Sequence, residues 1–444
     1  MPDPEPSDFD VAVLGGGSAA EALVAALGHR ELRIVVFEAH RVGGECPFVA
    51  CMPSKAMLHD AAAHTGWRDA IERRSGVIDH LDDSRHAEQL AAHGALLVRA
   101  AATITAPGRI EAAGSEYTAE HIVLATGSEL LMPPIEGIEE LGDRCWTSEQ
   151  ALLTEDRPTR LAIIGGGAIG CELATIFARF GSEVHLLDVA PQAFPDLPPA
   201  IGERVDDALR AAGVRVCRGI EIEQVACRGG GVRTTLANGA GLDTDRIIVA
   251  AGRRPLTQGL GLEQIGVADP ARLAVDDTGR VTADGSVWAI GDVAGRGQYT
   301  HVANHHANVV ANALCGDGTR RFDDVVTPAC VFTDPPLMTI GPRPAELSDD
   351  DVVWVSANLS ETPRWTTDAL ADGVLTIAVD RRSRTVVAAH GVGASFDVLA
   401  AALVTAIDGR IPVDQLTRSM WPFPSIGEIL GVVYSRAVES LGDA

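Results

Sequence analysis

Two cysteines five positions apart are the residues whose type and spacing most directly indicate chemistry. Cys46 and Cys51 lie in the segment 41–55, RVGGECPFVACMPSK. On an unbroken helix, Cα atoms five residues apart are roughly 8 to 9 Å from each other, whereas a disulfide requires roughly 4.4 to 6.8 Å. The two sulfurs can therefore bond only if the chain between them is distorted.

The neighbouring residues favour such a distortion. Gly43 and Gly44 let the backbone approach a bound group closely, and Pro47, which lacks an N–H, suits the first turn of a helix or a kink. A strained disulfide at the positive end of a helix is easily reduced and leaves a thiolate of low pKa. These features describe a redox-active disulfide, and the alternative is two buried structural cysteines.

The whole pattern, GGxCxxxxCxPSK, resembles the active-site helix of the flavoprotein disulfide reductases, which include dihydrolipoamide dehydrogenase, glutathione reductase and mercuric reductase. In that family the first cysteine attacks the substrate disulfide and the second faces the flavin. The resemblance implies these roles for Cys46 and Cys51. It also implies that Gly44 contacts the cofactor and that Lys55 forms an ion pair with Glu172 beside the flavin.

Such cysteines must be positioned by a flavin-binding fold, and the sequence opens with a fingerprint of one. A buried strand runs from residue 10 into a glycine turn, with Gly15, Gly17 and Ala20 at the G-x-G-x-x-G/A positions. These positions serve a tight turn, backbone approach to a pyrophosphate, and close packing of helix on strand. A second apolar strand ends in Glu38, whose carboxylate can accept a hydrogen bond from a ribose hydroxyl.

A second fingerprint follows at 160–172, RLAIIGGGAIGCE, with Gly165, Gly167 and Gly170 at full spacing. Two such units about 150 residues apart make an accidental match improbable, so we expect two dinucleotides, one in each fold. Because the cysteine pair directly follows the first unit, that unit should bind FAD. The second unit should bind the nicotinamide donor.

The second unit also bears on the choice of donor, because its next strand ends in Asp188. A carboxylate at this position hydrogen-bonds the free 2′-hydroxyl of NAD and repels the 2′-phosphate of NADP, which is bound by arginine instead. No basic residue lies between His185 and Arg204. The sequence therefore favours NADH over NADPH.

Three more strand ends resemble parts of the family's flavin domain. The segment 122–128, IVLATGS, resembles the strand that closes that domain, and 249–255, VAAGRRP, resembles the passage that returns the chain to it. The segment 287–294, VWAIGDVA, carries an aspartate that in the family contacts the ribityl chain, although Gly-Asp at a strand end is also a common turn. The cofactor-contacting residues expected from these segments are Thr126, Gly127, Gly252 and Asp292.

Three histidines lie just beyond, at 301, 305 and 306. Their spacing invites a metal site, but such a site needs a third ligand and preferably a context like HExxH. No suitable carboxylate accompanies them. We expect no metal here, and instead a helix packed near the flavin.

The last part of the chain, from about residue 327, resembles the family's entry into its dimer-forming domain. Alternating apolar strands at 351–356, 373–379 and 385–392 precede an apolar helix at 395–408. This order predicts an antiparallel sheet with helices on one face. The resemblance implies a homodimer.

The predicted fold is therefore α/β, with two Rossmann-like dinucleotide-binding domains and a C-terminal α+β dimerisation domain. The predicted domains are 1–153 with 256–324 for FAD, 154–255 for NAD(P), and 325–444 for dimerisation.

The sequence departs from the family where a catalytic histidine is expected. Most disulfide reductases have a His-Pro-Thr segment near the C-terminus with a glutamate shortly after, and the aligned stretch here is 421–428, WPFPSIGE. Pro424 and Glu428 are retained, so a catalytic role is implied for Glu428. Phe423 occupies the histidine position and cannot carry a proton.

Proton delivery to a leaving sulfur is typically worth about 10² to 10⁴ in rate, so this loss bears on the acceptor. The nearest alternative in sequence is His59, which shares a helical face with Cys51 and Lys55. Mercuric reductase also lacks the histidine but uses a further cysteine pair near its C-terminus. The last cysteine here is Cys330, which argues against mercury as the substrate.

Composition limits the partners. The formal charge of −25, from 36 basic and 61 acidic residues, disfavours nucleic acid and anionic membranes. No apolar run approaches roughly 20 residues, and the N-terminus is acidic rather than basic, so we expect neither a membrane span nor a secretion signal. The expected location is the cytoplasm.

The expected activity is transfer of hydride from NADH to FAD, and of two electrons through Cys51 and then Cys46 to a small-molecule acceptor. The acceptor could be a lipoyl-type or other small disulfide, as for dihydrolipoamide dehydrogenase. It could instead be a quinone, dye or metal ion, whose reduction requires no thiol proton. A third, non-catalytic alternative is a redox sensor.

Overall fold

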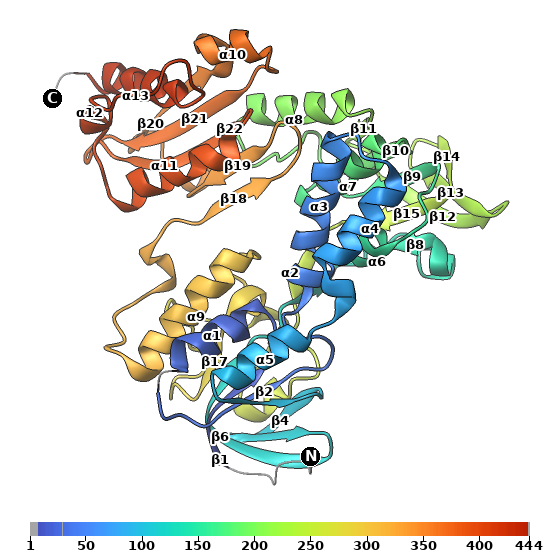
Figure 1. Cartoon of the computed structure of the whole chain (residues 1–444), viewed down its shortest axis with the longest axis vertical. Coiled ribbons are helices and arrows are strands. Elements are labelled where there is room, and N and C mark those ends of the chain that lie inside the picture. The colour runs from blue at the N-terminus through green and yellow to red at the C-terminus, as the bar shows by residue number, and fades with distance from the viewer. Residues whose placement is uncertain (1–7, 29, 443–444) are drawn as a thin grey trace. The chain divides into compact units, whose positions relative to one another are not determined.

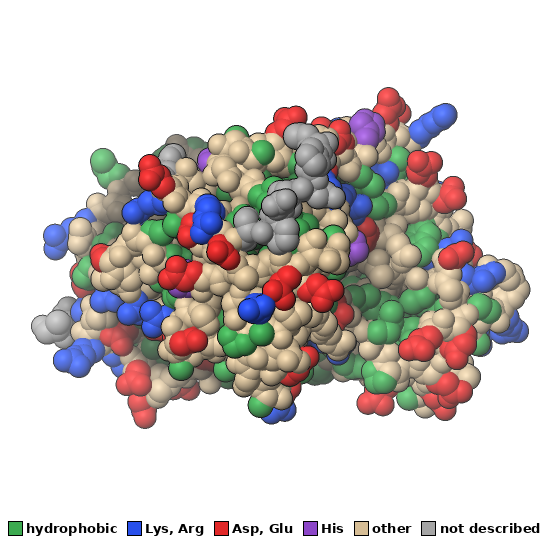
Figure 2. All heavy atoms as spheres, turned by 90° about the horizontal axis from the view of Figure 1, so that it is seen from below, with side chains coloured by type: hydrophobic (Ala, Val, Ile, Leu, Met, Phe, Trp, Pro, Cys, Tyr) green, Lys and Arg blue, Asp and Glu red, His purple; other side chains and the backbone are tan. Residues whose placement is uncertain are grey.

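The computed structural model describes residues 8–28 and 30–442, so the acidic stretch at 1–7 lies outside the described residues. Among the helices in these residues, none is both long enough and apolar enough to cross a membrane. Figure 2 shows acidic side chains scattered over the face it presents, with lysines and arginines among them. On that face the negative charge is dispersed.

The described chain forms two compact units. Three stretches make up the first unit: the described residues up to Ala56, Glu72–Leu131 and Gly252–Asp324. Three others make up the second: Met57–Ile71, Met132–Ala251, and the described residues from Val325 onwards. The three predicted domains do not coincide with these units, because the predicted FAD domain includes residues 57–71 and 132–153 of the second unit. The predicted domain boundaries stay predictions.

The first unit is built on one mixed sheet covered by helices. Its elements are β1 (Asp8–Leu14), α1 (Ser18–Leu27), β2 (Ile34–Phe37), α2 (Glu45–Phe48), α5 (Ser84–Ala92), β3 (Ala95–Val98), β4 (Ala102–Ala106), β5 (Arg109–Ala112), β6 (Ser115–Leu124), β7 (Ser128–Leu130), β16 (Arg253–Pro255), β17 (Val287–Ala289) and α9 (Thr300–Cys315). The strand order is β3-β2-β1-β6-β5-β4, with β17 paired to β6. Helix α1 packs against α9 (Figure 1). Helix α5 packs against β3.

The parallel part of this sheet is formed by β3, β2, β1, β6 and β17. All four residues of β2, IVVF, are buried. A run of apolar residues without alternation is typical of parallel strands that are covered on both faces. Parallel strands also bring their C-terminal ends to one edge of the sheet, where dinucleotides bind in such folds.

The second unit contains the second dinucleotide-binding fold. Its elements are β8 (Cys145–Trp146), α6 (Ser148–Leu153), β9 (Arg160–Ile164), α7 (Ala168–Arg179), β10 (Glu183–Asp188), α8 (Pro199–Ala211), β11 (Arg215–Arg218), β12 (Ile222–Arg228), β13 (Gly231–Leu236), β14 (Gly241–Thr244) and β15 (Arg246–Val249). A parallel sheet has the order β11-β10-β9-β15-β8, and β12, β13 and β14 form a separate antiparallel sheet. Helices α3 (Cys51–Ala62) and α4 (Trp67–Val77) each contain residues of both units.

The second unit ends in an antiparallel sheet with the order β18-β19-β22-β21-β20. Its elements are β18 (Pro328–Val331), β19 (Leu337–Ile340), β20 (Val352–Asn358), α10 (Pro363–Asp368), β21 (Val374–Asp380), β22 (Val386–Val392), α11 (Phe396–Asp408), α12 (Val413–Leu416) and α13 (Glu428–Leu441). One face of the sheet shares an apolar core with α11 and α13. The three predicted strands and the predicted helix are each found within one or two residues of the expected bounds.

Candidate functional site

The two cysteines lie on either side of a break between helices. Cys46 is in the short helix α2, Cys51 begins α3, and Val49 between them has φ −134° and ψ 4°. The chain is thus distorted between the cysteines, as the distance argument requires of a pair able to bond. Both residues are partly buried free thiols in this structure.

The side chain of Thr300 meets both sulfurs from the first residue of α9. Its hydroxyl donates a hydrogen bond to the Cys46 sulfur at 3.1 Å and lies 3.9 Å from the Cys51 sulfur. Sequence reasoning missed Thr300 because it lies 254 positions from Cys46. The threonine directly before the three histidines was the only available signal, and those histidines drew attention to metal binding instead.

The pKa of the Cys46 thiol is raised rather than lowered. A hydrogen bond with Cys51, burial, and the charge of Cys51 raise it, while the hydroxyl of Thr300 and the charge of Lys55 act in the opposite direction. The expectation of a low-pKa thiolate is therefore wrong for this dithiol form. The reason is that the hydrogen bond and the charge of Cys51, together with burial, disfavour a thiolate on Cys46.

The cysteine segment is attached directly to the first glycine fingerprint. The N–H of Gly43 donates to the carbonyl of Gly16 at 2.8 Å, and Gly44 has φ +71°. A Cβ at Gly44 would lie 3.0 Å from the Cα of Gly17. Only glycine permits this approach, so the turn that should bind a pyrophosphate and the turn that carries the cysteines pack backbone against backbone.

The two fingerprints have matching backbone geometry. Gly15 and Gly165 both have φ +104°, and an added Cβ would lie 2.3 Å from the carbonyl oxygen of Ala125 in the first fold and of Ala250 in the second. Gly17 precedes α1 and Gly167 precedes α7, and neither helix start has a side-chain cap. Uncapped N–H groups at such a helix start are available to a phosphate. These cradles fit FAD and a nicotinamide dinucleotide.

The third fingerprint position brings helix and turn together in both folds. Ala20 is fully buried on α1, and at Gly170 an added Cβ would lie 1.9 Å from the carbonyl oxygen of Gly165. The second fold therefore accepts only glycine at this position, whereas the first accommodates a methyl group.

The acid that follows each fingerprint contacts its own glycine turn. The carboxylate of Glu38 accepts from the N–H of Gly16 at 2.6 Å, and that of Asp188 accepts from the N–H of Gly166 at 3.1 Å. Each acid therefore lies at the edge of the sheet where an adenosine ribose binds in these folds.

A polar network connects the remaining flavin-side candidates. Strands β7 and β16 pair antiparallel, with Arg253 opposite Leu130. Arg253 donates to the hydroxyl of Ser128 at 2.8 Å, to its carbonyl at 2.7 Å, and to the carboxylate of Glu45 at 2.8 Å. Because Glu45 directly precedes Cys46, this arginine links the strand pair to the cysteine turn.

Asp292 belongs to the same network. Its carboxylate accepts from the Ser128 hydroxyl at 2.7 Å, and burial raises its pKa against the opposing effects of Ser128 and Arg253. Thr126 donates to the carbonyl of Leu256 at 2.6 Å. The structure thus gathers Asp292 and the strand ends at 126–128 and 252–253 in the first unit.

Gly127 and Gly252 leave space beside these strand ends. Both have positive φ, and an added Cβ at either would meet no atom within 4 Å. This is compatible with the expected cofactor contacts, which stay predictions.

Arg218 is a residue that sequence reasoning missed in the second fold. Its side chain is 7% exposed and donates to Asp188 at 2.6 Å and to Asp206 at 2.8 Å. The sequence between His185 and Arg204 contains no basic residue, and the arginine that contacts Asp188 lies further along the chain. Strands β10 and β11 are parallel neighbours and pair Asp188 with Arg218, so a basic residue ending the next strand was the available signal.

Three further candidates lie on helices α3 and α7. Lys55 donates to the hydroxyl of Ser54 at 3.3 Å, and the carboxylate of the buried Glu172 accepts from the N–H of Phe332 at 3.0 Å. The Lys55–Glu172 ion pair stays a prediction. His59 is exposed in the last turn of α3, roughly 12 Å along the helix from Cys51.

The segment that replaces the family histidine is open to solvent. Phe423 is 76% exposed, and Glu428 at the start of α13 accepts from the N–H of Ser425 at 2.9 Å. The carboxylate of Glu428 therefore contacts the backbone of the turn that precedes its own helix. Its predicted catalytic role stays a prediction.

Within the part of the chain that the structure describes, no group of three His, Cys, Asp or Glu side chains is positioned to hold a metal ion. His306 is buried and stacks on Phe322 with ring centroids 3.7 Å apart, and burial lowers its pKa to about 4. It is thus a neutral core residue of α9.

Comparisons with known proteins identify the family of the chain. The family model described as "Pyridine nucleotide-disulphide oxidoreductase" matches residues 9–307, and that for its dimerisation domain matches residues 327–433. The chain therefore belongs to the pyridine nucleotide-disulfide oxidoreductase family and is an FAD-dependent oxidoreductase that uses NAD(P)H. The predicted family and α/β fold are confirmed.

Several relatives match over nearly their whole length. Mercuric reductase of Streptomyces lividans is 29% identical, covering 95% of this chain and 94% of that protein. Dihydrolipoyl dehydrogenase of Pseudomonas aeruginosa is 30% identical with 97% of both chains covered. The solved structure of the HOCl-induced flavoprotein disulfide reductase RclA from Escherichia coli is 29% identical, covers 96% of this chain and 99% of that chain, and has a TM-score of 0.88.

Proposed function

We propose that this protein transfers electrons from NADH, through FAD bound in the first fold, to the Cys46–Cys51 disulfide and then to a small-molecule acceptor. When bound, FAD accepts a hydride from the nicotinamide and passes electrons onward. The observation that carries the proposal is the attachment of the cysteine turn to the first fingerprint, through the Gly43–Gly16 hydrogen bond. This attachment ties the thiols to the cradle that fits the flavin pyrophosphate.

The chain's own residues account for the thiol steps. Two electrons and two protons convert the Cys46–Cys51 disulfide into two thiols. With a disulfide acceptor, the Cys46 thiolate attacks one sulfur and releases the other as a thiolate. Cys51 then attacks the mixed disulfide, which re-forms the Cys46–Cys51 bond and releases the second acceptor thiolate.

Thr300 supports this sequence because its hydroxyl can donate to a thiolate at either sulfur. A threonine hydroxyl does not ionise near neutral pH, so it stabilises the thiolate without serving as a base. The family histidine would exchange protons at this step, and Phe423 cannot. Turnover with a disulfide should consequently be slow, by about 10² to 10⁴ if no other group delivers the proton.

The presence of Phe423 at the histidine position favours a second class of acceptor. A quinone, dye or metal ion takes electrons without protonation of a leaving sulfur, so the loss of a titratable group at Phe423 does not hinder its reduction. Mercuric reductases are among the relatives, and one solved structure of Escherichia coli RclA is described as a Cu(II) complex. We therefore keep this class beside the disulfide.

The experiment that tests the proposal uses the purified flavoprotein with NADH and three acceptors: lipoamide, a benzoquinone and Cu(II). In the Cys46→Ser variant, we expect loss of lipoamide reduction, while quinone reduction survives if the flavin is oxidised directly. Cys315→Ser, which changes another partly buried cysteine of the first unit, should behave as wild type. A wild-type protein that binds no FAD, or that fails to oxidise NADH with any acceptor, would contradict the proposal.

The dimerisation domain supports a homodimer. Residues 327–433 match the family model for that domain. Light scattering after size-exclusion chromatography should give twice the chain mass of 46.5 kDa. A monomer that retains full disulfide turnover would contradict this part of the proposal.

A further inference from the structure

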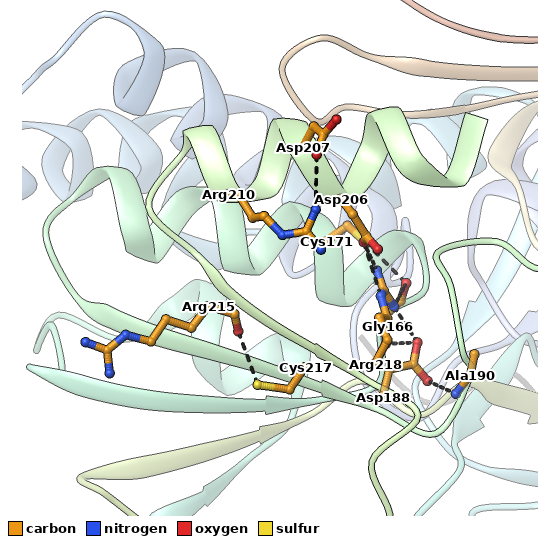
Figure 3. Close-up of polar contacts among 10 residues, drawn as sticks. All are labelled: Gly166, Cys171, Asp188, Ala190, Asp206, Asp207, Arg210, Arg215, Cys217 and Arg218. Atoms are coloured by element: carbon orange, nitrogen blue, oxygen red, sulfur yellow. Dashed lines mark hydrogen bonds and ion pairs between the residues drawn. The ribbon is translucent and has the colours of Figure 1, made fainter. Parts of the chain in front are cut away.

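Arg218 is buried between the carboxylates of Asp188 and Asp206. Asp188 is the acid that follows the second glycine fingerprint. Its Nη1 donates to Asp188 at 2.6 Å, while Nη2 and Nε donate to Asp206 at 2.8 and 3.2 Å (Figure 3). The side chains of Arg218, Asp188 and Asp206 are 7%, 14% and 10% exposed. A charge this buried is stable in a protein only if it is paired, so the three groups depend on one another.

Three elements bring these groups together. Asp188 ends β10, Arg218 ends its parallel neighbour β11, and Asp206 lies on the buried face of α8, which precedes β11. The next residue on α8 has a different environment, because Asp207 is 70% exposed and contacts Arg210 at 3.1 Å. Figure 3 shows Asp206 and Asp207 extending from the helix toward different arginines.

Arg218 has little capacity left for a ligand. Besides its three bonds to carboxylates, Nη1 donates to the carbonyl of Gly166 at 3.4 Å. Four of the five N–H groups of a guanidinium are thus directed at acceptors of the protein. A 2′-phosphate is normally bound by the two-pronged face of a free guanidinium, which this arrangement does not offer.

Asp188, by contrast, keeps a site for a hydroxyl. One of its oxygens accepts from Gly166 at 3.1 Å and from Arg218, and the other accepts from the N–H of Ala190 at 3.1 Å. A carboxylate has about four lone-pair positions, so one remains on the second oxygen. The carboxylate is therefore fixed in orientation with capacity for one more donor.

The glycine turn at Gly166 lies directly against Arg218. An added Cβ at Gly166 would lie 1.9 Å from Nη1 of Arg218 and 2.5 Å from the Asp188 carboxylate. The carbonyl of Gly166 also accepts from the Cys171 sulfur at 3.3 Å. Glycine at this position thus allows Arg218 to lie directly against the turn that should hold the donor's pyrophosphate.

We infer that Arg218 is a specificity-determining residue of the nicotinamide-donor site. Held by Asp206, it orients Asp188 to accept a hydrogen bond from the 2′-hydroxyl of NADH, and it is kept from binding the 2′-phosphate of NADPH. The inference rests on the proposal that the second fold binds the donor. One guanidinium between two carboxylates leaves a net charge of −1, which repels a phosphate and tolerates a hydroxyl.

The test measures equilibrium binding of NAD⁺ and NADP⁺ to the FAD-loaded protein by calorimetry, which requires no acceptor. We expect wild type to bind NAD⁺ at least 100-fold more tightly. Asp206→Asn, which frees one side of the guanidinium, should lower that ratio at least tenfold, whereas Asp207→Asn should leave it unchanged. The double variant Asp188→Ser/Asp206→Asn should prefer NADP⁺.

The outcomes distinguish a failure of the role inferred for Arg218 from a failure of the proposed function. Equal ratios for wild type, Asp206→Asn and Asp207→Asn, in variants that retain FAD and the wild-type unfolding temperature, would overturn the role of Arg218. Should Asp206→Asn not fold, a wild-type protein that prefers NADP⁺ would still contradict the inference, because the paired Arg218 is inferred not to bind the 2′-phosphate. A wild-type protein that binds neither nucleotide refutes the proposed function instead.

Discussion

The hydroxyl of Thr300 donates a hydrogen bond to the sulfur of Cys46 across 3.1 Å, although 254 positions separate the two residues in the chain. Thr300 begins α9, which packs on α1 of the first dinucleotide fold, so the fold itself places this hydroxyl at the cysteine turn. The hydrogen bond lowers the pKa of Cys46 and opposes the larger effects of Cys51 and burial. Thr300 therefore favours the thiolate that must attack an acceptor.

We predict that Thr300→Val makes the Cys46 thiolate harder to form. Valine has the same shape but no hydroxyl, so the pKa of Cys46 should rise further. A hydrogen bond to a charged group contributes about 1.5 to 3 kcal/mol, which corresponds to at least tenfold slower disulfide reduction at pH 7. Alkylation of the NADH-reduced enzyme by iodoacetamide, followed across pH, should shift to higher pH.

Thr300→Ser is the control for this change, since it keeps the hydroxyl. It should alkylate within about threefold of wild type, the hydrogen bond being retained. An identical alkylation profile for valine and wild type would show that the hydroxyl does not act on the thiolate.

A second prediction concerns the missing histidine. If the dimer places this segment as the family resemblance implies, Phe423→His should restore a proton carrier for the thiol step. General acid–base assistance of about 10² to 10⁴ is available in principle, and we expect at least a tenfold gain in dihydrolipoamide turnover near pH 8. Phe423→Leu, which removes the ring without adding a proton carrier, is the matched control.

The residue is well suited to this substitution because its side chain is 76% exposed, so the core of the described chain is not disturbed. No gain from Phe423→His at any pH between 6 and 9 would indicate that the acceptor site itself differs from that of the disulfide reductases.

Much of the fold was predictable because its signals are local in sequence. The spacing of Gly15, Gly17 and Ala20 fixes a turn, and the distance between Cys46 and Cys51 required the helix break that the structure contains. Alternating apolar residues likewise predicted three strands of the terminal sheet, β20, β21 and β22, within one or two positions, but not β18 and β19. In each case the residues that determine the element lie within about a dozen positions of one another.

Contacts between distant segments were not predictable in this way. Arg218 reaches Asp188 only because β10 and β11 are adjacent and parallel, and strand order is a property of the whole sheet. Proximity in sequence therefore did not identify the basic residue that contacts Asp188. Thr300 escaped notice for the same reason, since nothing near it in sequence indicates two sulfurs.

A third prediction tests which glycine fingerprint binds FAD and which binds the nicotinamide dinucleotide. Gly15 and Gly165 have the same φ of +104° and the same 2.3 Å clash for an added Cβ, so alanine is equally strained at both. Each substitution should cost at least about 2 kcal/mol locally. Gly15→Ala should lose FAD. Gly165→Ala should retain FAD but bind nicotinamide dinucleotide at least tenfold more weakly.

The ratio of flavin to protein absorbance and calorimetry with NAD⁺ measure these two effects. Gly239→Ala is the control, because Gly239 also has positive φ but an added Cβ there meets no atom within 4 Å. The reverse pattern, with FAD lost from Gly165→Ala and retained in Gly15→Ala, would contradict the assignment of the two folds.

The last prediction follows from the buried carboxylate of Asp292. Burial raises its pKa above the ordinary 3.8, so ionisation costs more in the folded protein than in the unfolded chain. For an acid with a raised pKa, stability is fully present below the unfolded pKa and is lost as pH rises through the folded pKa. At neutral pH the charged carboxylate thus destabilises the FAD-free protein, although Ser128 donates to it at 2.7 Å.

Asp292→Asn removes that charge while keeping the size of the side chain, so the FAD-free variant should unfold at a higher temperature than wild type at pH 8. The difference should shrink as pH is lowered toward 4, because the wild-type carboxyl then becomes neutral. The same substitution should weaken FAD binding several-fold, since an amide is a poorer acceptor than a carboxylate for a ribityl hydroxyl, at about 1 kcal/mol. Differential scanning fluorimetry of both forms measures the two effects, and a variant that lowers the unfolding temperature of the FAD-free protein at pH 8 would show that the charge of Asp292 is stabilising.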